Sequence, residues 1–338
     1  MAAASGFLNV RKPQGVTSHR CVLMVRQLFG TRRVGHGGTL DPMATGVLTM
    51  ALGNATKFLQ ASAAQYLTSD KEYNGVIRFG VTTDTDDITG NVLRKHEVPW
   101  LTERQVRDAL QRYVGTIDQV PPRVSAIKKD GKRMYELART NQLQQADVKA
   151  RRVHISSIEL RKFTPGLFPE AKIHVACAAG TYIRSIAREC GEALATPTPT
   201  DSADAPPCVG GTLAALERSR SGIFGLDTSV DFDELRRLLQ AGENPLEPIE
   251  NALTHLPFVQ LPPEAAHMWQ IGGVSWARPA DFMSGGDRAD AREGPCAVAN
   301  GETVRVFRAG ATPEFLGVSQ VERPHWSDDF VLRTRAFA

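Results

Sequence analysis

At residues 35–48 the sequence runs Gly35-His36-Gly37-Gly38-Thr39-Leu40-Asp41-Pro42-Met43-Ala44-Thr45-Gly46-Val47-Leu48. Asp41 is the one acidic residue among the first sixty, and the glycines beside it allow a ligand to approach the backbone closely. An Asp followed by Pro is also how many helices begin, with Asp as the N-cap. The alternative is chemical, because Arg32, Arg33 and His36 could hold a lone carboxylate ionised, as a carboxylate nucleophile requires.

Charge is distributed unevenly along the chain. The 338 residues carry 40 Lys and Arg against 37 Asp and Glu, a net charge of +3. Residues 1–60 have a net charge of +6 and residues 121–162 have +7, which leaves −10 for the remainder. Such asymmetry is expected where one part of a surface meets nucleic acid, although a basic run can equally be a solvated face.

The composition excludes several classes of protein. With 42% apolar and 23% charged residues the chain is globular in composition, and its length favours two domains, or one large domain and a small one. We expect a cytoplasmic protein, because no apolar stretch approaches the roughly 18 residues of a membrane helix and the first residues lack the pattern of a secretory signal. The five cysteines include no C-x-x-C pair, and the eight histidines show no metal-ligand spacing, so no metal site is expected.

Apolar spacing and turn residues predict strands and helices without regular βαβ alternation. Strands are expected at about 7–10, 47–52, 72–79, 152–162 and 171–177. A helix capped by Ser18 and closed by Gly30 should follow the first strand. Further helices are expected at about 103–114, 182–194, 212–219 and 232–241. This order favours an α+β fold around a mainly antiparallel sheet.

Two later segments differ from the rest. Residues 195–208 contain four prolines and no large apolar side chain, which predicts a mobile surface insertion. After Pro257 short strand-like pieces alternate with Gly and Pro, which predicts a compact β-rich module of about 80 residues. The predicted domains are therefore 1–253 and 254–338.

Arg184 stands where a predicted strand passes into a helix, within Gly180-Thr181-Tyr182-Ile183-Arg184. From the first helical turns it could point to a site at the end of the strand, where a guanidinium offers a carboxylate two parallel hydrogen bonds. An Arg on a helix turn is also commonly a surface residue. Spacing alone does not bring Arg184 to Asp41.

Residues 35–48 closely resemble the signature loop of the TruB family of bacterial tRNA pseudouridine-55 synthases. Other segments resemble further motifs of that family, in the same order along the chain. These segments are Lys12–Gly15, Lys71–Tyr73, Gly80–Asp87, Gln119–Arg123, Gly131–Arg139 and Gly180–Arg184. The resemblance is strong over about residues 6–225 and weak in the C-terminal module. Several separated motifs in one order are more specific than any one alone.

The resemblance implies the isomerisation of a uridine at position 55, in the T loop of tRNA. The N-glycosidic bond breaks, the uracil turns while bound, and a carbon–carbon bond forms. Neither a cofactor nor a metal is implied, because the reaction is redox-neutral and the nucleophile is a side chain. The resemblance also implies a pseudouridine-synthase type of catalytic domain followed by a PUA-like RNA-binding module.

Three residues receive catalytic roles by their match to family motifs. Asp41 is the implied nucleophile, and Arg184 is the arginine that pairs with it. Tyr73 is implied to stack on the target uracil and is a candidate for proton transfer, although an aromatic residue in a strand is commonly a core residue.

Three others are implied to bind the RNA. His36 would insert into the T loop where the target base has left its stack, which fits the need to flip a base out before reacting with it. Lys12 and the basic residues of 121–162 would contact phosphate. Leu216, on the predicted helix, would pack against the uracil.

We therefore expect a stand-alone enzyme that binds the T stem-loop of tRNA as a monomer, with no obligatory protein partner and no membrane. Two alternatives stay open. One is a guide-RNA-dependent pseudouridine synthase, which the compact C-terminal module disfavours. The other is a tRNA-folding chaperone that binds without catalysis, and the presence of Asp41, Tyr73 and Arg184 favours catalysis over it.

Overall fold

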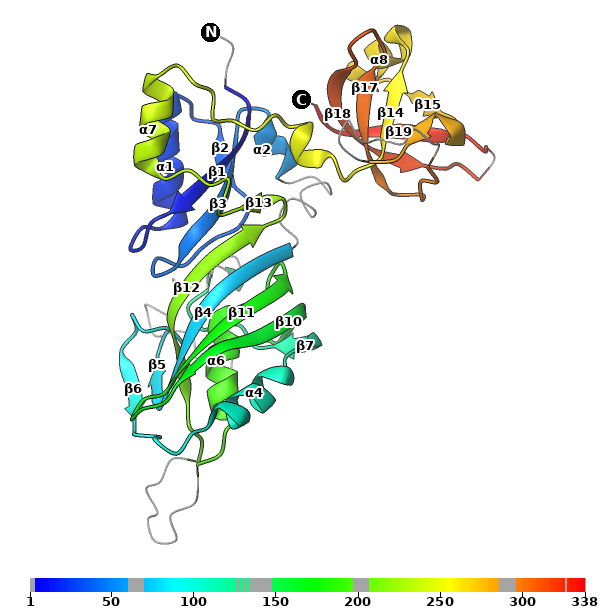
Figure 1. The fold of residues 1–338 in the computed structure, drawn as a ribbon. Coiled ribbons are helices and arrows are strands. Elements are labelled where there is room, and N and C mark those ends of the chain that lie inside the picture. Colours follow the sequence, from blue (N-terminus) through cyan, green and yellow to red (C-terminus); the bar gives the residue numbers. More distant parts are fainter. Residues whose placement is uncertain are drawn as a thin grey trace.

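The computed structural model describes residues 4–59, 70–125, 128–129, 132–133, 148–196, 207–285, 296–325 and 327–337. Within these ranges the chain forms a nine-stranded sheet and a six-stranded sheet, which stand apart in Figure 1. Two two-stranded sheets complete the strands, β5 (Val81–Thr83) with β6 (Val92–Lys95) and β8 (Lys128–Lys129) with β9 (Lys132–Arg133). The predicted α+β class is confirmed.

The nine-stranded sheet joins segments from distant parts of the chain. Its order is β1 (Gly6–Lys12), β3 (Thr45–Leu52), β12 (Gly211–Ser221), β4 (Asp70–Phe79), β11 (Glu170–Ala178), β10 (Arg151–Thr164) and β7 (Gly115–Gln119). In addition, β2 (Val34–His36) pairs with β3, and β13 (Phe224–Gly225) pairs with β12. Strands β12 and β3 run parallel, whereas every other described pair in this sheet is antiparallel. The prediction of a mainly antiparallel sheet is thus confirmed.

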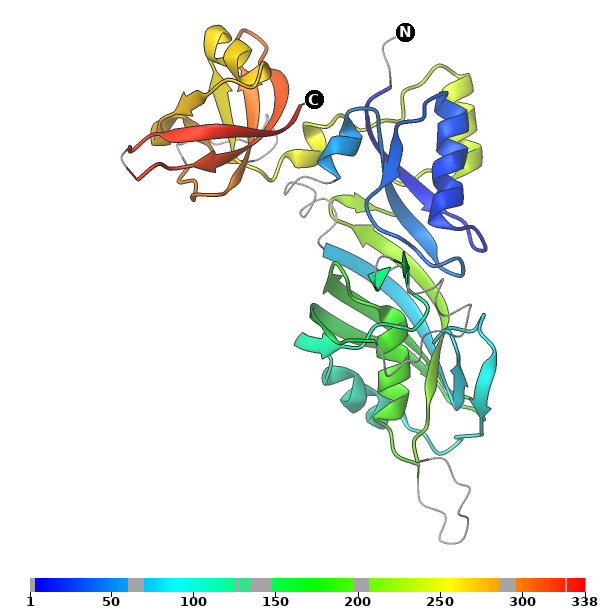
Figure 2. The same ribbon diagram turned by 180° about the vertical axis from the view of Figure 1, so that it is seen from behind.

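Helices cover each half of this sheet. Helices α1 (Ser18–Phe29) and α7 (Phe232–Gln240) lie side by side against one face of the β1–β3 end, and the short α2 (Ala55–Phe58) lies across the strands from them. On the other half, α4 (Glu103–Gln111) and α6 (Ile183–Glu192) cover the face that is turned to the viewer in Figure 2. One continuous apolar core joins the two halves, and it includes Val25, Leu48, Ile77, Val175 and Ile186. The predicted helices near 18–29, 103–114, 182–194 and 232–241 are confirmed with small shifts of their ends.

The helix predicted at 212–219 is wrong, because these residues form β12. Leu213 and Leu216 are both buried and are three residues apart, the spacing of a helix face. Irregularities in the pairing with β4, one of them between Leu213 and Ala215, insert an extra residue and so shift the twofold alternation of a strand. The bulge therefore produces a helix-like pattern in a strand.

The C-terminal residues form the second sheet. It is ordered β15 (Ser275–Ala277), β19 (Phe330–Phe337), β18 (Glu314–Glu322), β17 (Thr303–Arg308), β14 (Phe258–Leu261) and β16 (Phe282–Met283). Helix α8 (Pro263–Gln270) buries Trp269 in its core, where the indole Nε1 donates to the Ser319 hydroxyl at 2.7 Å. The prediction of a β-rich C-terminal part is confirmed, whereas the boundary between 253 and 254 stays a prediction. Short 3-10 turns lie at Asn251–Leu253 and Pro279–Asp281.

A second apolar cluster links the two sheets. Phe7 and Val47, from β1 and β3, belong to the same buried cluster as Val318 and Ala336 from β18 and β19. The ring of Phe58 in α2 lies 6.3 Å from that of Phe315. The C-terminal part therefore packs against β1 and against β3, the strand that leads out of residues 35–48.

Some predicted features lie outside the described residues. Most of the insertion (197–206) and much of the second basic segment (134–147) belong to these ranges. The ends of the insertion are described, and Ala195 pairs with Cys208 there. None of the described helices is long and apolar enough to cross a membrane.

Gly46 allows β12 to pack directly against the end of the Asp41 loop. Its backbone has a φ of +97°, and a Cβ at this position would lie 2.3 Å from the carbonyl oxygen of Arg218. Arg218 is its direct partner in the parallel pair. A side chain at residue 46 would therefore force the two strands apart.

Replacing Gly46 with Ala is expected to destabilise the protein more than the same change at Gly115. Gly115 has a nearly identical φ of +100°, but a Cβ there meets nothing within 4 Å. Gly115→Ala should cost about 1–3 kcal/mol for the backbone conformation alone. Gly46→Ala should cost about 1–3 kcal/mol more, because β3 and β12 must separate. Urea unfolding of the two variants measures the difference, and equal losses would contradict this view of the β3–β12 contact.

Candidate active site

A cavity of about 240 Å³ opens beside Asp41. Its walls come from four separate parts of the chain: the loop before β3, the first residues of β4, the start of α6, and β12. The lining residues are Thr39, Leu40, Asp41, Lys71, Tyr73, Gly180, Thr181, Tyr182, Ile183, Arg184 and Leu216. The structure thus brings together Asp41, Tyr73, Arg184 and Leu216, which the sequence analysis selected.

The carboxylate of Asp41 is held by the guanidinium of Arg184 at two points. Nη2 of Arg184 donates to Oδ1 at 2.9 Å, and Nε lies 2.9 Å from Oδ2. The Arg184 side chain is 5% exposed, whereas that of Asp41 is 30% exposed, so the carboxylate stays accessible from the cavity. The contact fixes the rotation of the carboxylate and sets a full positive charge against it. Arg32 and Arg33, the neighbours in sequence, are exposed.

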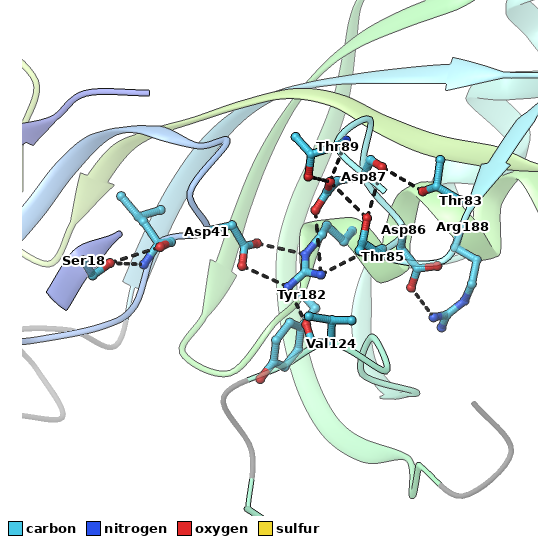
Figure 3. Close-up of polar contacts among 12 residues, drawn as sticks. Ser18, Asp41, Thr83, Thr85, Asp86, Asp87, Thr89, Val124, Tyr182 and Arg188 are labelled. Carbon is cyan, nitrogen blue, oxygen red and sulfur yellow. Dashed lines mark hydrogen bonds and ion pairs between the residues drawn. The ribbon is translucent and has the colours of Figure 1, made fainter. Parts of the chain in front are cut away.

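Arg184 is oriented in turn by the turn between β5 and β6 (Figure 3). Its Nη1 donates to the carbonyl of Thr85 at 2.8 Å and lies 3.9 Å from the carboxylate of Asp87. That carboxylate accepts hydrogen bonds from the amide and the hydroxyl of Thr89, at 2.9 and 2.5 Å. The acidic segment 84–87 after β5 therefore belongs to a turn that hydrogen bonds between its own residues stabilise. This turn also holds Arg184 in place.

Two further contacts fix the start of α6. Nη2 of Arg184 also donates to the carbonyl of Val124 at 3.0 Å. The buried amide of Gln119 accepts from the backbone N–H of Tyr182 at 2.8 Å and donates to its carbonyl at 3.1 Å. Gln119 therefore positions the residue that precedes α6. Its role was not predicted, although it belongs to one of the motifs on which the family resemblance rests.

The residue before Asp41 is fixed by Ser18. The Ser18 hydroxyl accepts from the N–H of Leu40 at 2.8 Å and donates to the Leu40 carbonyl at 3.0 Å. Ser18 is therefore not the N-cap of α1, and Thr17 takes that role by accepting from the N–H of Arg20. The predicted cap is one residue too late, because Thr17 and Ser18 both carry a hydroxyl group that suits an N-cap.

The residue after Asp41 is fixed by Lys12. The Lys12 ammonium donates to the carbonyls of Val16, Pro13 and Pro42 at 2.6, 3.0 and 3.3 Å. Its side chain is fully buried, and desolvation lowers its pKa to about 8. The predicted phosphate contact of Lys12 disagrees with this position, in which the ammonium faces the protein backbone. The alternative in which Asp41 is the N-cap of a helix is wrong. The chain forms a turn there, in which the N–H of Ala44 donates to the Asp41 carbonyl.

Arg218 clamps both ends of the loop and was not predicted. Its side chain is 1% exposed, with Nε donating to the carbonyl of Val47 at 2.7 Å and Nη2 to that of Gly38 at 3.2 Å. Arg218 is the direct cross-strand partner of Tyr73. Arg218 lies in the segment that was predicted to be a helix. A basic residue on a helix is commonly exposed, so its burial beside the site could not be predicted.

Tyr73 and Leu216 form the apolar part of the cavity wall. Tyr73 is 6% exposed and Leu216 is 7% exposed, and they come from the neighbouring strands β4 and β12. Burial raises the pKa of the Tyr73 hydroxyl, and the nearby charge of Arg218 acts in the opposite direction. An aromatic ring and an aliphatic side chain at one wall suit a flat, partly apolar ligand.

His36 lies at the end of β2, outside the set of residues that line the cavity. Its Nδ1 accepts a hydrogen bond from the N–H of Gly38 at 3.3 Å. The ring is therefore tied to the glycine segment that leads to Asp41. Its predicted contact with a T loop stays a prediction.

Within the described ranges, no three His, Cys, Asp or Glu side chains gather in a way that could hold a metal ion. The charged groups that line the cavity are those of Asp41, Lys71 and Arg184. Besides them, the cavity wall carries the phenol groups of Tyr73 and Tyr182.

Comparison with known proteins gives a consistent result. The family model described as TruB family pseudouridylate synthase (N terminal domain) matches residues 26–183. The tRNA pseudouridine synthase B of Gloeobacter violaceus is 45% identical over 267 residues, which cover 79% of this chain and 85% of the relative. That of a Synechocystis strain is 44% identical over 268 residues, which cover 79% and 84%.

Solved structures agree on the fold. A chain of the crystal structure of a Cbf5-Nop10-Gar1 complex aligns with 95% of this chain and 79% of its own length, with a TM-score of 0.65 and 23% identity. At that identity the likeness concerns the fold alone. The sequence motifs, the family model and the relatives together show that the chain belongs to the TruB family of pseudouridylate synthases.

Proposed function

We propose that this chain isomerises a uridine in the T loop of tRNA, at position 55, to pseudouridine, with Asp41 as the nucleophile. The observation that carries the proposal is the two-point contact between Arg184 and a carboxylate that remains open to the cavity. The curated relatives are called tRNA pseudouridine synthase B, which supports both the reaction and the class of RNA.

Asp41 acts on the ribose side of the glycosidic bond. A nucleophilic carboxylate needs a fixed orientation and an accessible oxygen. Asp41 has both, because Arg184 fixes its carboxylate from one side and the other side stays open to the cavity. Ser18 and Lys12 fix the backbone on either side, so the carboxylate does not depend on a mobile loop for its position.

Tyr73 and Leu216 bind the base. We propose that the uracil enters the cavity against the Tyr73 ring and that Leu216 packs on the same base. The raised pKa of Tyr73 keeps its hydroxyl protonated at neutral pH, so it is a proton donor before it is a base.

The RNA-binding surface is proposed to include exposed basic residues near the cavity. Arg151 and Arg152 begin β10 and are exposed, and the charge of Arg151 acts on Tyr182 in the cavity wall. His36 is proposed to fill the gap that the flipped base leaves in the T loop. The enzyme is further proposed to act as a cytoplasmic monomer, without a guide RNA or an obligatory protein partner, and to use its β-rich C-terminal part for RNA binding.

Asp41→Asn is expected to abolish pseudouridine formation and to leave RNA binding intact. The amide keeps the shape of the carboxylate but is a poor nucleophile, so the rate should fall by about 10⁴-fold or more. Tritium release from a T stem-loop labelled at carbon 5 of uridine measures the reaction, with and without added guide RNA. Asp233→Asn, on an exposed acid of α7, is the matched control.

Undiminished tritium release by Asp41→Asn would overturn the assignment of the nucleophile. A requirement for guide RNA by the wild-type protein would favour the guide-dependent alternative. Binding of the stem-loop without any tritium release by the wild-type protein would favour the chaperone.

Arg152→Ala and Lys12→Met are expected to affect RNA binding differently. Arg152 is exposed, so its loss should lower the slope of log Kd against log salt by about 1. Lys12 is buried among carbonyls, so Lys12→Met should leave that slope unchanged and reduce stability instead. Filter binding of the stem-loop at several salt concentrations distinguishes them, and an equal change of slope in both variants would restore the phosphate role of Lys12.

A further inference from the structure

Lys71 is a cation in the cavity that the reaction described above does not use. It lies two residues before Tyr73 on β4, so both side chains leave the same face of the strand, and both line the cavity. Its ammonium reaches the glycine segment of the Asp41 loop, where it lies 3.1 Å from the place that a Cβ on Gly38 would take. Gly38 thus leaves room for the ammonium at the edge of the cavity.

The charge of Lys71 has no acidic partner among the described residues. No described carboxylate forms an ion pair with it, and the guanidinium of Arg218, from β12, is a second positive charge nearby. Its strand neighbours are Cys177 in β11 and Ser221 in β12. Burial raises the pKa of the Cys177 thiol to about 11, so that neighbour is neutral as well. Across the cavity, Asp41 is already paired with Arg184.

Burial is also unfavourable for the Lys71 charge itself. Desolvation, helped by Arg218, lowers the pKa of Lys71 to about 8. A partly buried cation without a counter-charge is costly, and a ligand that brings negative charge to it removes part of that cost. The cavity therefore favours a ligand whose negative charge arrives, or develops, beside Lys71.

Pseudouridine formation produces such a charge. When the bond between N1 and C1′ breaks, its electron pair remains on the uracil, and the negative charge is shared among N1 and the two carbonyl oxygens. In the second half of the reaction C5 supplies the electron pair of the new bond to C1′ as C1′ separates from Asp41. The C5 proton passes to water, and N1 takes up a proton from water. The detached base is thus an anion that must be held while it turns.

We propose that Lys71 donates a hydrogen bond to a carbonyl oxygen of the uracil and stabilises the base as an anion while it is detached from the ribose. This inference rests on the proposed function. Lys71 and Tyr73 line the same cavity from the same side of β4, so a uracil stacked on Tyr73 lies within reach of the Lys71 ammonium. Donors aimed at the place where charge develops stabilise a transition state more than a ground state.

The test compares Lys71→Met and Lys71→Arg in the full-length protein, with single-turnover tritium release from the labelled T stem-loop. Lys71→Met should lower the rate constant by about 10²–10³-fold, the usual effect of losing one such donor, with little change in the Kd of the stem-loop. Lys71→Arg should retain more of the rate because it keeps the charge. Lys172→Met, on an exposed lysine of the neighbouring strand β11, is the matched control.

The pH profile separates this role from a structural one. A lysine is charged below its pKa, so the wild-type rate constant should fall as the pH rises through about 8, the pKa of Lys71. Lys71→Arg should move this fall to higher pH, and Lys71→Met should remove it. Thermal unfolding midpoints show whether each variant is folded.

Two results would overturn the role of Lys71. One is a folded Lys71→Met variant with the wild-type rate constant and pH profile. The other is a weakened Kd with an unchanged rate constant, which would indicate a phosphate contact instead. Absence of tritium release by the wild-type protein would be a failure of the proposed function, and it is distinguishable because it does not depend on Lys71.

Discussion

The arrangement of the site depends on buried cations whose charge is met mainly by backbone carbonyls. Lys12 holds the carbonyl that follows Asp41, and Arg218 holds carbonyls at both ends of the same loop. A buried ammonium or guanidinium must be surrounded by acceptors, so each of them determines the path of the chain around it. Releasing the loop would remove carbonyl partners from these two charges, which opposes its movement.

Asp41 is the carboxylate that stays open to the cavity within this cationic surrounding. Arg184 contacts it directly, and the turn around Asp87 holds Arg184 from behind. The nearby acids Asp86 and Glu189 contact Arg188, one helical turn further along α6. The two arginines of α6 therefore divide the acids between them, and only Arg184 faces the cavity.

The sequence could predict the residues of the site that lie within one motif, but not the contacts between residues from different motifs. Asp41 was recognisable from its own loop, whereas its contact with Arg184, 143 residues away, was available only through the family resemblance. Leu216 was assigned to a helix because bulges in β12 disturb the alternation of a strand. Lys12 was assigned to phosphate binding through the family resemblance, and its burial follows from carbonyls that only the folded chain supplies.

Because β12 lies between β3 and β4, the sheet fixes the distances between the residues that face each other across the cavity. The proposed nucleophile precedes β3, and the residues proposed to bind the base stand on β4 and β12. Their separation is therefore set by inter-strand steps of about 4.8 Å each. A distance set by a hydrogen-bonded lattice does not change when a connecting loop is lengthened. The connection between α6 and β12 can therefore carry the segment 195–208, whose ends pair at Ala195 and Cys208, without altering the spacing across the cavity.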